Sequence, residues 1–203
     1  MPPVLPSRAL PDAPDPGTRA NLCDPRLLFD SHLAFVWRNL RRLGVPELQV
    51  EDAAQDVFLV VHRRWDTWSP TRSTVETWLF GIALRVARNY RRSQQRRLAW
   101  FASSTGHEAL QEAPAATDGP AEILARREAA AVFERALAAL DEPKRAVFLL
   151  VDVEQLAVPE AASLLGTNLN TAYWRLRKAR LAFRRALERI RAKEDALDRG
   201  TRP

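Results

Sequence analysis

The chain is poor in the residues that form disulfides and hold metal ions. Its 203 residues include one cysteine, Cys23, and three histidines, so no intrachain disulfide can form. A zinc site usually takes four Cys or His ligands, and Cys23 and His32 are the only candidate pair close in sequence. We therefore expect no metal and no cofactor. A single cysteine is compatible with a reducing cytosol, and we expect a cytoplasmic protein.

Long apolar runs and strand patterns are also lacking. No run of about 18 apolar residues occurs, so no membrane-spanning helix is expected. The first twenty residues have no apolar segment typical of a signal peptide, and six prolines in the first 16 residues predict a disordered leader over 1–24. Alternating patterns and hairpin turns do not stand out. The remaining signal is helical periodicity, which predicts an all-α fold.

Positive charge is in excess. The net charge is +6 and the pI is about 10.3, which favours a polyanionic partner. Only three of the 31 basic residues are lysines, so a GC-rich genome is a second explanation for the abundance of arginine. The placement of the charges is therefore more informative than their sum.

Breaks in the helical pattern divide the chain into two units. Helices are predicted over residues 25–43, 48–65 and from 75 onward, separated by a break at 44–46 and a polar loop at 66–74. Residues 98–124 hold four acids, two glycines, two prolines and no Lys or Arg, which predicts an acidic flexible linker. Helical patterning then fills 125–197 and leaves a tail, 198–203. We expect two small helical domains, 25–97 and 125–197.

The helix predicted over 51–65 has two different faces. An apolar stripe at helical spacing predicts burial of Ala54, Val57, Phe58, Val61 and Trp65. The opposite face carries Asp52, Gln55, Asp56 and Leu59. A lone exposed leucine is common, so this face has two interpretations, a solvated surface or an acidic docking patch with an apolar centre.

The stretch "TWLFGIALRVARNYRRSQQRR", residues 77–97, changes from apolar to uniformly cationic. Its polar side carries Arg85, Arg88, Asn89, Arg92 and Arg96. The whole stretch contains six arginines and no Asp or Glu. This composition favours a helix that contacts phosphates, the alternative being a solvated helix end stabilised by cations. The neighbouring tryptophans, Trp65, Trp68 and Trp78, are either base-stacking platforms or core, and we expect Trp78 to be mostly buried.

Residues 159–183 have the spacing of a helix-turn-helix. A short helix over about 158–165 ends at Gly166, and Thr167 or Asn168 can cap the next helix. Ala172, Leu176, Ala179 and Phe183 share the inward face. The outward face is polar and cationic and suits a DNA major groove, an ordinary helical hairpin being the alternative. Its candidate contacts are Asn170, Thr171, Tyr173, Trp174, Arg175, Arg177 and Lys178.

These motifs in this order resemble the bacterial RNA polymerase sigma factors of the extracytoplasmic-function (ECF) class, a branch of the sigma-70 family. The resemblance covers 25–97 as sigma region 2 and about 125–190 as sigma region 4. It implies that Asp52, Gln55, Asp56 and Leu59 dock on the β′ clamp coiled coil of core RNA polymerase, with the β flap as a second contact. It also implies an anti-sigma factor as a partner.

The resemblance further assigns the DNA contacts. It implies that residues of region 2 recognise and melt the −10 element: Trp68, Arg72, Trp78, Arg85, Arg88, Asn89, Arg92 and Arg96. The helix over 169–180 then reads the −35 element. Ser73, Val75, Asn89 and Trp174 depart from the residues frequent in the family, so no promoter sequence can be transferred.

The expected function is therefore that of a promoter-specificity subunit without catalytic activity, associated with the nucleoid when in holoenzyme. One alternative is a stand-alone helix-turn-helix regulator that binds duplex DNA as a dimer, but no obvious dimerisation heptads are present. Another is an RNA-modifying enzyme, for which no nucleophile–base pair, glycine-rich phosphate loop or metal cluster is found.

Overall fold

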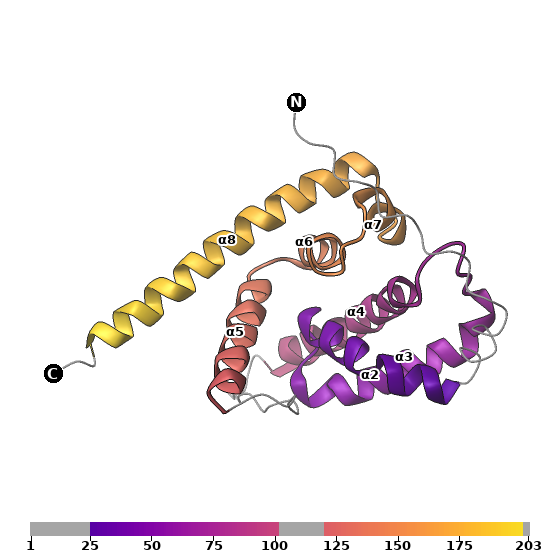
Figure 1. Cartoon of the computed structure of the whole chain (residues 1–203), viewed down its shortest axis with the longest axis horizontal. Helices are drawn as coiled ribbons and strands as arrows, with labels where there is room; N and C mark the ends of the chain where they lie inside the picture. Colours follow the sequence, from indigo (N-terminus) through magenta and orange to yellow (C-terminus); the bar gives the residue numbers. More distant parts are fainter. Residues whose placement is uncertain (1–24, 102–119, 201–203) are drawn as a thin grey trace.

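The computed structural model describes residues 25–101 and 120–200, which form helices and no strands (Figure 1). The predicted leader, 1–24, lies outside these residues, as does Cys23 of the candidate metal pair. The described part of the chain contains no group of three or more His, Cys, Asp or Glu that could hold a metal ion. None of its helices is both long and apolar enough to cross a membrane.

The first unit consists of three packed helices, α2 (Pro25–Arg42), α3 (Val50–Arg64) and α4 (Val75–Phe101). Two 3₁₀ turns, η1 (Glu47–Gln49) and η2 (Trp65–Thr67), connect them. The predicted apolar stripe of α3 faces its neighbours, with Ala54, Val57 and Val61 buried. Phe58 and Trp65 are half-buried against the same core.

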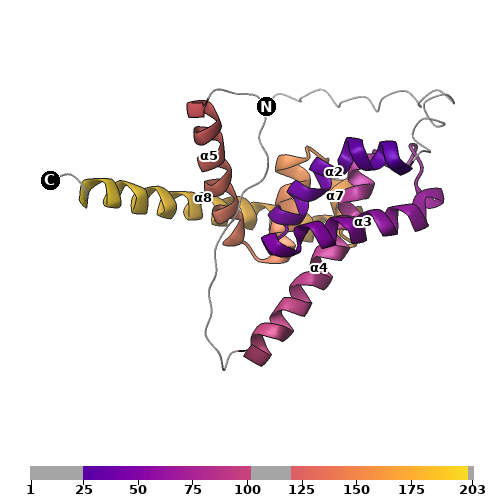
Figure 2. The same cartoon turned by 90° about the horizontal axis from the view of Figure 1, so that it is seen from below.

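The second unit consists of α5 (Pro120–Ala138), α6 (Glu142–Phe148), α7 (Val158–Leu164) and α8 (Leu169–Gly200). The π-helical turn η3 (Leu149–Val153) continues α6 toward α7. α8 packs against α5, α6 and α7, and its long C-terminal half leaves the body of the molecule beside α5 (Figures 1 and 2). This arrangement leaves one side of α8 exposed from Asn170 to Arg191.

Two glycines end helices in the same way. Gly44 (φ +89°) and Gly166 (φ +61°) adopt the left-handed conformation that glycine favours. After α2, the amides of Gly44 and Val45 donate to Arg41 O and Leu40 O. After α7, those of Gly166 and Thr167 donate to Ser163 O and Ala162 O. Both are Schellman motifs, so these glycines fix the α2 turn and the turn of the helix-turn-helix.

Helix boundaries differ from the predicted linker and tail. α4 continues through residues 98–101 and α5 begins at Pro120, so both helices enter the stretch 98–124. α8 likewise continues to Gly200, into the predicted tail 198–203. Composition marks helix ends only to within a few residues. The central part of the predicted linker, 102–119, lies outside the described residues.

One hydrophobic core runs through both units. Its buried members include Leu79 and Phe80 of α4, Leu137 of α5 and Leu149 of η3. Leu164 of α7 lies so near Gly81 of α4 that a Cβ at that glycine would be 3.0 Å from Leu164 Cδ1. The two units therefore pack against each other in this structure.

Candidate functional site

The predicted docking face of α3 is exposed. Asp52, Gln55, Asp56 and Leu59 all lie at the surface, and Leu59 is 54% exposed. Leu48 lies immediately before this helix and is 95% exposed. Sequence reasoning missed Leu48, although its spacing of four, seven and eleven residues to Asp52, Gln55 and Leu59 is the signal that could have found it. The face thus offers acids and an amide with two apolar side chains.

Asp56 forms a side-chain hydrogen bond with α4. Tyr90 Oη donates to Asp56 Oδ2 at 2.8 Å. Burial of the phenol and this hydrogen bond raise the pKa of Tyr90 to about 12, with the negative charges of Asp56 and Asp52 adding to the effect. The docking face and the basic helix are therefore connected through one side-chain contact.

The three tryptophans form one cluster at the turn before α4. Trp65 and Trp68 stack with ring centroids 5.3 Å apart, and Trp65 meets Trp78 edge-on at 5.9 Å. Trp68 Nε1 donates to Ser73 O at 3.2 Å, which pins the loop. All three side chains are half-buried, so each packs against the core and is also partly accessible. Arg72 of the same loop is exposed.

The basic side of α4 divides into two groups. Arg85, Asn89, Arg92 and Arg96 are exposed and lie at spacings of four, three and four residues, along one side of the helix. Arg88 is half-buried instead and faces the second unit, where its Nη2 lies 2.8 Å from Glu142 Oε1. The sequence predicted Arg88 as a DNA contact like the others, but in this structure it is already paired with a carboxylate.

The helix-turn-helix prediction matches the structure of α7 and α8. Asn168 Oδ1 accepts from Thr171 N at 2.8 Å, so Asn168 is the cap rather than Thr167. Ala172, Leu176 and Ala179 are buried. Phe183 packs on Phe133 and Phe148, with ring centroids 5.4 and 4.7 Å apart.

The outward face of α8 is accessible. Tyr173 and Trp174 are 52% and 56% exposed, and Asn170, Arg177 and Lys178 are exposed beside them. The Lys178 ammonium lies 5.9 Å from the Trp174 ring centroid, within range of a cation–π contact. Thr171 and Arg175, also predicted as contacts, are half-buried at the edge of this face.

A seam of ion pairs joins the two units, with the cations on the first and the acids on the second. The pairs are Arg41 with Glu134 at 2.8 Å, Arg42 with Glu154 at 3.8 Å, and Arg88 with Glu142 at 2.8 Å. The guanidinium of Arg42 also lies 5.5 Å from the Phe133 ring centroid. Its burial lowers the pKa of Arg42, and Glu154 opposes that shift.

Arg145 of α6 lies where the two units meet, against the turn after α2, and is 6% exposed. Its Nη2 donates to Ala138 O and Leu140 O, while its Nε has no hydrogen-bond partner within the described part of the chain. Burial, reinforced by the nearby positive charge of Arg91, lowers the pKa of Arg145 to about 10. The guanidinium lies directly against Gly44, so the α2 turn makes room for it.

Two sequence families match the two units. Sigma-70 region 2 matches residues 28–97, which lie in the unit α2–α4, and Sigma-70, region 4 matches residues 130–183, which run from the second half of α5 through the first half of α8. A fold of two helical units bearing these regions defines the class of bacterial RNA polymerase sigma factors.

Similarity to individual relatives extends over most of the chain. RNA polymerase sigma factor CnrH from Cupriavidus metallidurans is 32% identical over 142 residues, which is 69% of this chain and 74% of CnrH. NccH from Alcaligenes xylosoxydans is also 32% identical. The ECF RNA polymerase sigma-E factor of Escherichia coli K12 is 26% identical over 146 residues, covering 68% of this chain and 74% of that protein.

Two solved structures share the fold. The structure of CnrH in complex with the cytosolic domain of CnrY has a TM-score of 0.53 and 24% identity, over 84% of this chain and 94% of that chain. The sigma factor RpoE in complex with the anti-sigma factor NepR from Bartonella quintana has a TM-score of 0.54, also with 24% identity, over 79% and 96%.

The chain belongs to the ECF class of the sigma-70 family. Sigma factors direct RNA polymerase to promoters and are themselves non-catalytic. The family resemblance and the all-α fold predicted from the sequence are confirmed.

Proposed function

We propose that this protein binds core RNA polymerase through the exposed face of α3 and directs it to promoters with separate −10 and −35 elements. Asp52, Gln55, Asp56 and Leu59 contact the β′ clamp coiled coil, and the region 4 unit contacts the β flap. The observation that carries the proposal is that this face stays exposed while the other sides of α3 pack against α2 and α4. The holoenzyme forms in the cytoplasm and associates with the nucleoid.

The −10 contacts come from α4 and the loop before it. The exposed side chains of Arg85, Asn89, Arg92 and Arg96 contact the backbone of the −10 DNA. Arg72 and the half-buried Trp68 and Trp78 hold unpaired bases. The tryptophan cluster supports this role because a ring that is already packed against its neighbours loses little further freedom when a base stacks on it. Arg88 joins these contacts after Glu142 has moved away.

The −35 contacts come from the first half of α8. Asn170, Thr171, Arg177 and Lys178 reach base edges or phosphates, and Arg175 reaches the edge of the site. Tyr173 and Trp174 add apolar surface that suits thymine methyl groups. This half of the helix is fixed by its buried stripe, so its outward face is presented in one orientation.

The two reading units have to separate to perform this function. The elements lie about 25 base pairs apart, which is roughly 85 Å of duplex. α4 and α7 are in direct contact at Gly81 and Leu164, so the packed arrangement cannot engage both elements. Core polymerase binding therefore competes with the seam between the units. RpoE was solved with the anti-sigma factor NepR, and we propose that this protein also has an anti-sigma factor.

Run-off transcription tests the proposed function. Purified core polymerase is supplied with a genomic promoter library, with and without the full chain. Transcripts that appear only with the protein, from starts that share two spaced motifs, are the expected result. If no new transcripts appear while the folded protein alone binds duplex DNA tightly, the protein is a stand-alone regulator instead.

A further inference from the structure

α8 continues far beyond the helix that reads DNA in the proposed function. The region 4 family match ends at residue 183, whereas α8 continues to Gly200. From Asn170, the first reading residue, to Arg184 the helix advances about 21 Å. The DNA major groove is about 12 Å wide. A helix seated in the groove by its first turns therefore brings the following turns to the phosphates at the groove edge.

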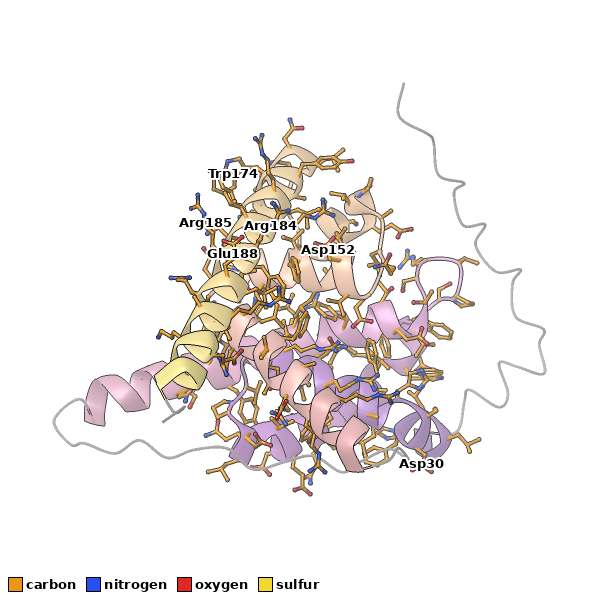
Figure 3. All side chains as sticks on the ribbon, turned by 60° about the vertical axis from the view of Figure 1, so that its left-hand side comes forward. Asp30, Asp152, Trp174, Arg184, Arg185 and Glu188 are labelled. Atoms are coloured by element: carbon orange, nitrogen blue, oxygen red, sulfur yellow. The ribbon has the colours of Figure 1, made fainter. Side chains whose placement is uncertain are left out.

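The second half of α8 repeats the cationic spacing of the first half. Arg177, Arg184 and Arg191 follow one another at intervals of seven residues, and Lys178 is followed seven residues later by Arg185. Seven residues are nearly two helical turns, so these side chains lie on nearly the same side of the helix. All five are exposed, and Figure 3 shows Trp174, Arg184, Arg185 and Glu188 along α8.

One other arginine of α8 already has a carboxylate partner within the chain. Arg180 is bound by Asp152, with its Nη2 2.6 Å from Oδ1, and the hydrogen bonds to Asp152 raise the pKa of Arg180. On the α5 side, Glu194 pairs with Arg135 at 3.1 Å. Within the described residues, Arg184, Arg185 and Arg191 have no ion pair. Their charge is therefore available to an outside anion.

The second half of α8 is also held in position. Its Ala186 is buried opposite α5, where Ala136 is buried as well, and Phe133 of α5 packs edge-on against Phe183. The Arg135–Glu194 pair closes the far end of this contact. α5 thus keeps the cationic extension in line with the reading face, so binding a rigid anion costs little ordering of the helix.

We propose that Arg184, Arg185 and Arg191 bind the backbone phosphates of duplex DNA that flanks the −35 element. This inference rests on the proposed function, since it takes the first half of α8 as the reading helix. Duplex DNA fits Arg184, Arg185 and Arg191 because its charges are regularly spaced and rigid, and because these arginines lie on the same side of α8 as Arg177 and Lys178 of the reading face. Phosphate contacts fix register and add affinity without sequence information. Glu188 lies among the cations and opposes the same contact.

The test compares holoenzymes assembled from core polymerase and variants of the full chain. The double variant Arg184→Ala/Arg185→Ala, the variant Glu188→Gln and a matched control, Lys193→Ala, are measured on a fluorescent promoter fragment over a range of salt concentrations. Lys193 is also exposed on α8, but its helical position lies away from the outward row. A second fragment carries a scrambled −35 element.

The double variant and Glu188→Gln are expected to change the affinity for DNA in opposite directions. The double variant lowers the slope of log affinity against log salt by about 0.9 for each phosphate that the variant no longer binds. It weakens the intact and scrambled fragments by the same factor. Glu188→Gln strengthens binding to both fragments, and Lys193→Ala changes neither.

Three outcomes would overturn the inference. They are an unchanged salt slope in the double variant, a loss confined to the intact −35 element, and a loss of affinity for core polymerase with unchanged DNA binding. The last outcome would assign the row to a protein partner. A wild-type holoenzyme that fails to start transcription contradicts the proposed function instead. In that case the salt dependence of duplex binding by the free chain tests the phosphate contacts separately.

Discussion

Arg88 of α4 and Glu142 of α6 form an ion pair across the two units, in which Arg88 Nε donates to Glu142 Oε1 at 2.9 Å. The two residues are 54 positions apart in the chain. Arg88 is one of the residues assigned to −10 DNA, so the packed arrangement places a carboxylate where the proposed function places a phosphate. The closed seam and DNA binding thus compete for the same guanidinium.

Removing that carboxylate should release Arg88. We expect Glu142→Gln to increase the affinity of the free chain for single-stranded DNA by up to about fivefold, since partly exposed ion pairs contribute about 0.2–1 kcal/mol. Fluorescence anisotropy with a labelled oligonucleotide measures the change. Glu128→Gln is the control, because Glu128 is an exposed acid of α5 and the change in net charge is identical. An equal gain in both variants would show that only net charge matters.

Charge reversal on α3 should weaken polymerase binding. We expect Asp52→Arg and Asp56→Arg each to reduce affinity for core polymerase at least about tenfold, because each places a repelling charge in the docking face. Helical content by circular dichroism should stay normal, since both side chains are exposed. Asp66→Arg, an equal change at an exposed acid outside α3, should leave the affinity intact. Wild-type affinity in the α3 variants would remove the docking assignment.

The Tyr90–Asp56 hydrogen bond predicts a dependence of stability on alkaline pH. The phenol keeps its proton to a pKa of about 12 in the folded protein, against an ordinary value of 10.0. The stabilisation is therefore fully present below pH 10 and is lost as the pH rises toward 12. Phenolate absorbance of a Tyr173→Phe variant, which retains Tyr90 as its only tyrosine, follows the titration. Adding Asp56→Asn should lower the pKa only in part, because burial is the larger cause.

Arg177 should contribute to −35 recognition. We expect Arg177→Ala to lower holoenzyme affinity by roughly 1–3 kcal/mol for the cognate −35 element if its guanidinium contacts bases. The measurement is a comparison of cognate and single-base-substituted fragments. If the variant loses affinity only for the fragment with the cognate base, Arg177 contacts that base. If it loses affinity equally for every fragment, Arg177 contacts a phosphate.

Two glycine substitutions separate the cost of backbone strain from the cost of disturbing the seam. Gly166→Ala places a Cβ in open space, so it should cost only the left-handed strain of about 1–2 kcal/mol. Gly44→Ala adds a steric conflict with the buried guanidinium of Arg145 to the same strain. We expect Gly44→Ala to lower the free energy of unfolding more, as measured by urea titration. Equal losses would indicate that Arg145 moves aside freely.

The sequence predicted the local structure well where a residue pattern is compatible with only one local conformation. The stripe Ala172, Leu176 and Ala179 is buried, and Gly166 has the left-handed conformation expected of a helix end. Helical periodicity and capping act over a few residues, so they can be read without knowledge of the fold. The prediction that Trp78 is mostly covered also agrees in direction, since it is half-buried against Trp65.

The sequence could not distinguish the arginines of α4 from one another. Arg85 and Arg88 belong to the same acid-free stretch, yet Arg85 is exposed and Arg88 is paired. The difference comes from Glu142, which reaches α4 only because the second unit packs on the first. Leu48 could have been found from its helical spacing to Asp52, Gln55 and Leu59, but its 95% exposure is known only from the structure.

The sequence by itself therefore determined the family, the helices and the types of surface that the chain presents, because these depend on local periodicity and on motifs in a fixed order. Only the tertiary structure decided which arginines form ion pairs with carboxylates of the chain. An arginine is neutralised by any carboxylate that folding brings within about 4 Å, and sequence separation places no limit on that distance. In this protein, folding joins α4 to the region 4 unit through an ion pair and leaves Arg184, Arg185 and Arg191 of α8 without one among the described residues.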